Sequence, residues 1–573
     1  MSRTPVPDLR FDPPGPGAWT LDSARFPQPA TAFAIELFPG PAARGFKEAT
    51  AGYGLLMDRV EWAFVHRWAY LCPRPLQARA EGMTRESWRA MVAASEALRE
   101  RLSVSATVFE RRRWRDEVAR WDRWTKPRMS RAHRALQAVE LAGLQTPELL
   151  SYLDRCRQNL RGAIYEHHRL NVAPVIPFGD FLVHAQDWCG RPAAGLVELV
   201  TGLDPLAVAA GPELTALAEA THRDPAAGSA LASGHQPACV LASLASLPGE
   251  AGRAATEYIG LVGWWSAGSG FDIGEPCLLE LPHLLVARIA SAVEHRGRGA
   301  QPERGAELVA EVRATVPAAS RDAFDQLLLE ARATHRVRDE RAIYCDVWAH
   351  GLTRRAILAA GRRVARAGAI ECPQHLLEAG YGELRSLIAG TGGPSREELV
   401  ERARYRRDAT EDRVPEVLGA PPPAPVPVDW LASGPARTER AFRTYLEAMS
   451  GAQPEMGARV LSGVPASPGT CRGVARIVRS AADLARIRPG DVLVTGSTTP
   501  AIGAVLPLLA GIVTDRGGLL SHAAIVAREF GIPAVVGTGD ATTRIPDGAL
   551  VAVDGAAGQA VLLGSDSDPN RSR

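Results

Sequence analysis

Lysine is almost absent from this chain. The 573 residues contain only Lys47 and Lys126, so arginine supplies the other 64 of the 66 basic residues. The phosphate-binding motif GxxxxGK[ST] is missing, and the chain has few lysine amines that could bind the phosphates of a nucleotide. Acidic residues number 64, which leaves a net charge of only +2. This balance gives no indication of a nucleic acid or a membrane surface as a partner.

Paired cysteines and long apolar runs are also lacking. The eight cysteines form no CxxC pair and no Cys/His cluster at zinc spacing, so we read them as reduced, mostly buried thiols and predict no metal site. No run of about 18 apolar residues occurs, and the proline-rich N-terminus has no apolar core of the signal-peptide kind. We therefore expect a soluble, cytoplasmic protein.

The pattern of apolar residues changes along the chain. From about residue 45 to 410, apolar residues recur at intervals of three and four between charges, which predicts helices. The stretch APPPAPVPVDW at 420–430 favours a stiff polyproline connector, and a helix-like segment follows it. After Gly457, short β-rich runs such as DVLVTG and ALVAVDG predict an α/β domain. We expect a multidomain protein: a mostly α-helical domain over 1–410, a linker and helix over 411–455, a C-terminal α/β domain over 456–565 and a tail over 566–573.

One histidine, His522, stands where a glycine turn becomes a helix. GIVTD reads as a buried strand, Gly517 and Gly518 permit a tight turn, and Ser521 is a natural N-cap for HAAIVAREF. Free N–H groups and the helix dipole favour a phosphoryl group in the first helical turn. An imidazole placed there can be phosphorylated on nitrogen and act as a covalent carrier. The alternative is a histidine that only packs or hydrogen-bonds at a helix start.

The segment GGLLSHAAIVAREFGIPAVVG closely resembles a known sequence signature. It is similar to the phosphohistidine signature of the swivelling, or mobile, domain of the PEP-utilising enzymes, which include phosphoenolpyruvate synthases, pyruvate phosphate dikinases and rifampin phosphotransferases. The resemblance runs from about Gly463 to Leu563. It implies that His522 is the phosphocarrier and that Gly517, Gly518 and Ser521 shape its turn.

The region before this domain has a looser resemblance. FPQPATAF, EHHRLNVAPVIPFGDFL, GFDIGEP and RVRDERAIYCDVW are similar to segments of the helical substrate-binding domain of rifampin phosphotransferases, and the domain order agrees. The resemblance implies that the helical domain holds a small molecule with an acceptor hydroxyl. About 45 residues precede this region and about ten follow the carrier domain, too few for the ATP-grasp domain or barrel of the longer relatives. We expect ATP and Mg²⁺ to be bound mainly by a separate ATP-grasp protein or subunit, in the layout of phenylphosphate synthases.

Charged residues of the helical region supply the first candidates for substrate binding. His168, or its neighbour His167, could act as a general base or contact phosphate; adjacent histidines point to different helix faces, so at most one should face a pocket. Arg338 and Arg341 in RVRDER could bind an oxyanion through their guanidinium forks. A structural histidine and a solvated, ion-paired helix face are the respective alternatives.

The segment GWWSAGSGFDIG supplies the other candidates. Trp264 and Trp265 could form a flat wall for a bulky or aromatic substrate, and core packing is the alternative. Asp272, just after the turn, is a weaker candidate for binding or catalysis.

These observations predict a phosphotransferase component that relays a phosphoryl group from ATP through His522 to an organic hydroxyl. The resemblance implies transfer of the β-phosphoryl group, with AMP and inorganic phosphate as the other products. Two alternatives stay open: phosphorylation could activate the hydroxyl for elimination of phosphate, giving a net dehydration or cyclisation, or the domain could be a phosphorylation-dependent regulatory module. The sequence does not identify the acceptor.

Overall fold

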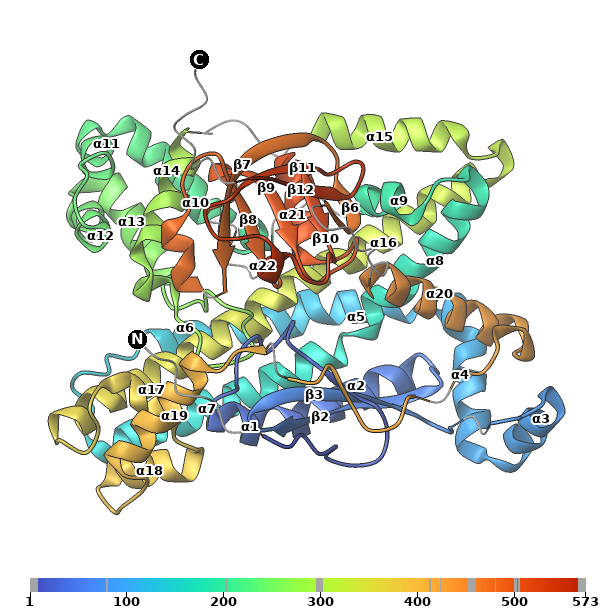
Figure 1. Ribbon diagram of the computed structural model, residues 1–573, viewed down its shortest axis with the longest axis horizontal. Coiled ribbons are helices and arrows are strands. Elements are labelled where there is room, and N and C mark those ends of the chain that lie inside the picture. The colour runs from blue at the N-terminus through green and yellow to red at the C-terminus, as the bar shows by residue number, and fades with distance from the viewer. Residues whose placement is uncertain are drawn as a thin grey trace. The chain divides into compact units, whose positions relative to one another are not determined.

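The chain folds into two compact units. Unit 1 comprises Met1–Val175, Ser269–Glu275 and Tyr344–Arg440, and unit 2 comprises Ile176–Gly268, Pro276–Ile343 and Ala441–Arg573. Figure 1 labels the helices and strands of this computed structural model. It describes residues 9–78, 81–200, 205–294, 302–411, 414–422, 424–450, 460–479, 481–498, 502 and 505–564. The predicted boundary near 455 and the predicted tail 566–573 lie outside the described residues.

Unit 1 contains a four-stranded antiparallel sheet within the region where the sequence predicted helices. Its order is β2-β3-β1-β4, and β2 and β3 form a long hairpin. The hairpin turns through His66 and Arg67, whose φ angles of 48° and 69° are both positive. Such a two-residue turn usually contains Asn or Gly, so this one gives no recognisable hairpin signal in the sequence. The strands are β1 (Trp19–Leu21), β2 (Met57–Val65), β3 (Trp68–Pro75) and β4 (Val417–Leu418).

Helices make up most of the rest of unit 1. In α4, the residues that face inward recur every three or four positions, at Leu98, Arg101, Ser105 and Val108. Two short segments, η1 (Trp121–Thr125) and η4 (Ala342–Val347), are π-helical. The α-helices are α1 (Ala32–Leu37), α2 (Pro39–Gly52), α3 (Arg85–Ala94), α4 (Glu96–Arg111), α5 (Arg113–Arg120), α6 (Lys126–Gln137), α7 (Thr146–Arg169), α17 (Trp348–Arg366), α18 (Tyr381–Ala389) and α19 (Arg396–Asp408).

Unit 2 combines a helical part with the C-terminal sheet. The helix predicted after the proline-rich stretch is present as α20 (Ser433–Ser450), which reaches unit 2 at Ala441. Gly179 of α8 meets α20 so closely that a Cβ would lie 1.8 Å from the carbonyl oxygen of Ala441. The other helices are α8 (Val172–Cys189), α9 (Ala193–Val200), α10 (Pro205–Arg223), α11 (Pro225–Leu231), α12 (Pro237–Ser246), α13 (Gly249–Val262), α14 (Pro282–Glu294), α15 (Pro302–Thr315) and α16 (Arg321–Arg341).

The C-terminal part of unit 2 is an α/β region, as the sequence predicted. Its eight-stranded sheet has the order β5-β12-β11-β7-β8-β9-β10-β6, with parallel pairing from β7 through β10. Valine, isoleucine and alanine side chains fill the core of this sheet. Its elements are β5 (Val460–Ser462), β6 (Val464–Ser467), β7 (Thr470–Val478), β8 (Asp491–Thr495), β9 (Leu509–Thr514), α21 (His522–Phe530), β10 (Ala534–Val536), α22 (Ala541–Arg544), β11 (Leu550–Asp554) and β12 (Gln559–Gly564).

The described residues 424–427 of the proline-rich stretch form neither helix nor strand and belong to unit 1. Val426 is buried against Trp88 and Leu98 of α3 and α4. Among the described helices of the chain, none is long and apolar enough to cross a membrane.

Candidate functional site

The turn before α21 follows the geometry that the sequence predicts. Ser521 is the N-cap, and its Oγ accepts the N–H of Ala524 at 3.3 Å. Gly517 has a φ of 118°, and a Cβ there would lie 2.8 Å from the Cβ of Ser521. Gly518 is not a positive-φ glycine; its carbonyl oxygen accepts the N–H of Ser521 at 3.0 Å. His522 is thereby fixed as the first residue of α21.

A threonine from the neighbouring strand orients the imidazole of His522. Thr498 Oγ1 lies 3.1 Å from Nδ1 of His522. Thr498 follows β8, and β8 pairs in parallel with β9, the strand that leads to His522. Neighbouring parallel strands end at the same sheet edge, which brings the two side chains together. Sequence reasoning missed Thr498; the signal that could have found it is the polar GSTT directly after the strand DVLVT.

Two arginines hold the loop that precedes His522. Arg528, at the other end of α21, donates from Nη2 to the carbonyl oxygen of Leu519 at 2.8 Å and from Nη1 to that of Ala466 at 2.9 Å. Arg338 of α16 donates from Nη2 to the carbonyl oxygen of Leu520 at 3.2 Å. Consecutive carbonyls of the loop are therefore held from two helices.

Charged groups of both signs lie near Arg528 and His335. Burial lowers the pKa of Arg528 to about 10, partly opposed by the negative charges of Glu198 and Glu529. His335 lies one helical turn before Arg338 and is 3% exposed. Burial, together with the charges of Arg338 and Arg528, holds the pKa of His335 well below its usual range. His335 is consequently a neutral ring beside two cations.

The remaining candidates of unit 2 lie in the helical part. Trp265 is 1% exposed and is part of the core, whereas Trp264 is half-buried. The backbone N–H of Leu278 donates to the carbonyl oxygen of Trp265 at 3.0 Å, which ties this turn to the chain beyond the loop. Arg341 is buried near the end of α16.

The two candidates of unit 1 are engaged in packing and loop contacts. The ring of His168 is completely buried, with Nδ1 2.8 Å from the carbonyl oxygen of Ile164 and edge contacts to Phe38 and Trp62. Asp272 accepts the backbone N–H of Thr31 at 2.7 Å, the hydroxyl of Thr31 at 2.8 Å and the N–H of Gly274 at 2.7 Å. These bonds secure the start of α1 and the turn that follows Asp272.

His167, the neighbour of His168, has a different environment. Its Nδ1 lies 2.9 Å from Oδ1 of Asp346, and both side chains are less than a tenth exposed. The rings of His167 and His168 are nevertheless only 4.7 Å apart between centroids. The neighbours of the two rings differ, and the expectation that at most one of them faces a pocket stays a prediction.

The region around His522 is similar to a domain of known proteins. Residues 487–558 match the family model "PEP-utilising enzyme, mobile domain", which includes the loop and α21. Chondramide synthase cmdD of Chondromyces crocatus is 44% identical over 149 residues, 26% of this chain and 4% of that protein. Phosphoenolpyruvate synthase of Aeropyrum pernix is 50% identical over 103 residues, covering 18% of this chain and 13% of that enzyme.

A third relative extends beyond the carrier domain. Rifampicin phosphotransferase of Streptomyces sviceus is 29% identical over 339 residues, 56% of this chain and 36% of that enzyme. The chain thus spans between 4% and 36% of the length of these three curated relatives. Residues 487–558 are thus a mobile domain of the PEP-utilising enzyme kind, and His522 is the first residue of its helix α21.

Proposed function

We propose that this protein is a phosphotransferase component in which His522 carries a phosphoryl group from ATP to a hydroxyl of a small organic molecule. The observation that carries the proposal is the position of His522 in a PEP-utilising mobile domain, as the first residue of α21 with its Nδ1 next to Thr498. The relatives named as phosphoenolpyruvate synthase and rifampicin phosphotransferase support this class of chemistry.

The proposed chemistry uses the second ring nitrogen. In the neutral imidazole with its proton on Nδ1, that N–H donates to Thr498 Oγ1, so the lone pair lies on Nε2. Nε2 attacks the β-phosphorus of ATP, the P–O bond to AMP breaks and AMP leaves, and water removes the γ-phosphoryl group as inorganic phosphate. The remaining phosphoryl group then lies near the N-terminus of a nine-residue helix. Free N–H groups and the helix dipole stabilise the negative charge there.

The loop contacts support the same assignment. Arg528 and Arg338 hold the carbonyls of Leu519 and Leu520, so the turn that presents His522 is fixed before phosphorylation. A carrier that is already oriented loses less entropy on reaching the transition state than a mobile one. We propose a positioning role for both arginines, and we keep Arg341, Trp264 and Trp265 as predicted contacts of the acceptor.

ATP and Mg²⁺ are assigned to a partner in this proposal. Among the described residues, no group of three or more His, Cys, Asp or Glu side chains could hold a metal ion. We propose that an ATP-grasp protein binds Mg-ATP and phosphorylates His522, releasing AMP and inorganic phosphate.

The test is intact-protein mass spectrometry at neutral to alkaline pH. The wild type and His522→Ala are incubated with Mg-ATP and a catalytically active ATP-grasp protein encoded beside this one. An acid-labile adduct of about 80 Da on the wild type and none on the variant supports the relay. Absence of the adduct from the wild type contradicts it and leaves His522 as a structural helix start.

Product analysis separates transfer from the two alternatives. A stable phosphate ester of the acceptor supports phosphoryl transfer. An unsaturated or cyclised product with free phosphate supports the phosphorylation-coupled elimination, and a phosphorylated protein that turns over no small molecule supports a regulatory module.

A further inference from the structure

One stretch of unit 1 is far more basic than the chain as a whole. Residues 111–134 contain ten basic and three acidic residues, whereas all 573 residues together carry a net charge of only +2. Eight of these ten basic side chains are exposed, and only Arg112 and Lys126 are half-buried. Positive charge is therefore concentrated in one exposed segment of unit 1.

This segment forms a single helix with a wide turn in its middle. α5, η1 and α6 follow one another directly, and the residues at both junctions have right-handed helical backbone angles. Trp121 in the π-helical turn is completely buried, whereas Trp124, three residues later, is 72% exposed. Trp124 is the most exposed of the large apolar side chains that the structure describes. The helix thus places one tryptophan in the core and leaves the other on the surface.

Arginines flank Trp124 along the helix. Arg120, Trp124, Arg128 and Arg131 recur at intervals of four and three residues, which is the spacing of neighbours on one helix face. We call these four residues the Trp124 row. Nη2 of Arg128 lies 3.2 Å from Oε1 of Glu166 on α7, and Nη2 of Arg120 lies 3.8 Å from the same oxygen. One carboxylate therefore orients the two arginines on either side of the indole.

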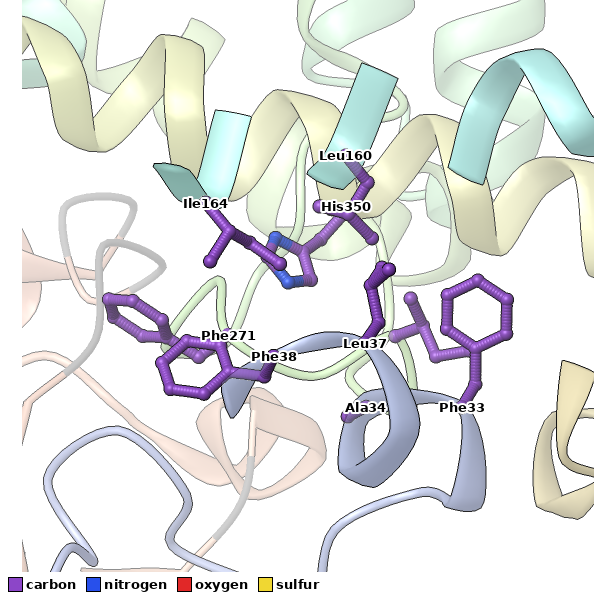
Figure 2. Close-up of a pocket in the computed structure, with 9 residues that line it drawn as sticks. Phe33, Ala34, Leu37, Phe38, Leu160, Ile164, Phe271 and His350 are labelled. Carbon is purple, nitrogen blue, oxygen red and sulfur yellow. The ribbon is translucent and has the colours of Figure 1, made fainter. Parts of the chain in front are cut away.

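The interior of unit 1 is less suited to binding. The apolar cavity that Figure 2 shows is lined by Phe33, Phe38, Phe271 and His350 among others. Its volume of about 10 Å³ corresponds to about one water molecule, so it does not accept an organic ligand. The exposed Trp124 row is the better candidate for a binding surface of this unit.

We propose that the Trp124 row is the docking surface for an acidic, carboxylate-rich surface of the ATP-grasp protein. This inference rests on the proposed function, because that function assigns ATP to a separate protein. Glu166 also accepts Nε of Arg169 at 2.8 Å, so one carboxylate serves three guanidinium groups and the row keeps a positive charge. Carboxylates of the partner accept the remaining N–H groups of the arginines, and the indole of Trp124 fills an apolar pocket between them.

A partner on unit 1 does not have to move with the carrier. Residues 487–558 match a mobile domain, so a partner held only there would travel with His522. A partner held on the helices of unit 1 stays bound while the carrier moves, and its ATP site remains at a high effective concentration near the chain.

Other classes of partner fit the row less well. Single-stranded nucleic acids stack several bases on successive aromatic rings, but Trp114 and Trp121 of the same segment are buried and leave one exposed ring. A helix that lies on a membrane needs a wide apolar face, whereas the other exposed residues of 111–134 are all charged. An acidic protein surface matches both the single aromatic anchor and the charge around it.

The test compares Trp124→Ala and Arg131→Glu with two control variants. Leu329→Ala is the apolar control, because Leu329 is 63% exposed, and Arg362→Glu is the charge control, because Arg362 is an exposed arginine of α17. Titration calorimetry measures the affinity for the ATP-grasp protein encoded beside this chain. The initial rate of His522 phosphorylation is then measured as a function of the concentration of that protein.

We expect Trp124→Ala and Arg131→Glu to raise the dissociation constant and the half-saturating partner concentration by about 10–100-fold, with an unchanged maximal rate. Salt screens charges, so raising NaCl from about 50 to about 500 mM should weaken binding by the wild type more than binding by Arg131→Glu. Both control variants should behave like the wild type. Circular dichroism and thermal unfolding show that weaker binding does not reflect unfolding.

The outcomes distinguish this inference from the function on which it rests. A wild type that binds the active ATP-grasp protein but acquires no phosphoryl group overturns the proposed function, and one that neither binds nor is charged overturns both. A charged wild type whose Trp124→Ala variant has the same dissociation constant and half-saturating concentration overturns the docking surface alone. The docking surface is also wrong if Trp124→Ala lowers only the maximal rate, or if it abolishes binding to a single-stranded oligonucleotide or an anionic vesicle instead.

Discussion

Nη2 of Arg528 donates to the carbonyl oxygen of Leu519 over 2.8 Å and so ties the last turn of α21 to the loop just before its first turn. The other terminal nitrogen of Arg528, Nη1, donates to the carbonyl oxygen of Ala466 near the end of β6. One buried guanidinium therefore joins a strand, the loop and the helix that carries His522. The loop depends on a side chain that follows it in the sequence, which makes loop and helix a single unit for the predictions below.

Arg528→Lys should destabilise the protein and slow phosphorylation of His522. A lysine ammonium is a point charge and cannot reproduce the fork that reaches two carbonyls in different elements. Leaving one of these part-buried acceptors without a partner costs up to about 1–3 kcal/mol. Thermal unfolding and the initial rate of adduct formation measure the two effects. Arg544→Lys is the control, because Arg544 lies on α22, away from the loop, and its Nη1 lies 3.5 Å from Oδ1 of Asp540. Equal behaviour of the two variants would contradict the role of Arg528.

Thr498→Val should weaken the selection of the His522 tautomer while keeping the side-chain volume. In the proposed tautomer, loss of the hydroxyl at 3.1 Å leaves Nδ1–H without this acceptor, and a neutral hydrogen bond of this kind contributes about 0.5–1.5 kcal/mol. We expect phosphorylation of His522 to slow by about threefold to tenfold. ¹⁵N NMR of labelled histidine reports the tautomer directly, and Thr498→Ser should restore both the tautomer and the rate. An unchanged tautomer in the valine variant would exclude this role for Thr498.

Gly517→Ala should be more damaging than an alanine at another positive-φ glycine. Gly517 has a φ of 118°, and its added Cβ would meet the Cβ of Ser521 at 2.8 Å. Gly531 has a φ of 64°, but nothing lies within 4 Å of its added Cβ. Both variants therefore carry backbone strain of about 1–3 kcal/mol, and only Gly517→Ala adds a steric clash. The melting temperature and the rate of adduct formation are measured for both variants. If Gly531→Ala is as impaired as Gly517→Ala, backbone strain alone accounts for the damage, and the contact with Ser521 does not contribute.

The sequence was sufficient for this turn because its information is local. Gly517, Ser521 and His522 lie within six residues, and each has a conformational reason for its place. Thr498 is 24 residues earlier, and its proximity follows only from the pairing of β8 with β9. A contact that depends on strand pairing cannot be predicted from the spacing of residues along the chain.

The unit 1 sheet and the His167–Asp346 pair show the same limit. The pair joins α7 to a π-helical segment far along the chain, and the spacing of the two segments in the sequence does not predict that they meet. The β2–β3 hairpin was missed because its turn residues, His66 and Arg67, do not signal positive φ. In both cases tertiary packing, and not local propensity, determines the conformation.

Acid should destabilise the protein through buried neutral histidines, and His133→Leu should reduce that effect. His133 has no hydrogen-bond partner for either ring nitrogen among the described residues, and burial lowers its pKa to about 3. The unfolded chain takes up the proton near pH 6.5, whereas the folded protein does not do so until about pH 3. Stability therefore falls as the pH decreases through this window, by about 2 kcal/mol between pH 7.5 and 5 for this group.

Urea unfolding of the wild type and His133→Leu at pH 7.5 and 5 measures this contribution. The variant should lose less stability on acidification, because leucine has no proton to take up in the unfolded state. His66→Leu is the comparison, since His66 is exposed in the hairpin turn. A pH dependence that is the same in His133→Leu and the wild type would mean that other groups dominate acid unfolding.

Arg338→Met should loosen the phosphohistidine loop from outside the mobile domain. Arg338 lies on α16, and its bond to the carbonyl oxygen of Leu520 is a charge-assisted contact worth about 1.5–3 kcal/mol. Methionine keeps much of the apolar stem but cannot donate, so amide hydrogen exchange across residues 519–522 should accelerate by about tenfold or more. Arg336→Met is the control, because Arg336 lies on the same helix and pairs with Glu340 at 2.7 Å. If both variants leave amide exchange in the loop unchanged, the bond from Arg338 does not stabilise the loop. The inference that the loop is held from two helices is then wrong, and Arg528 alone fixes it.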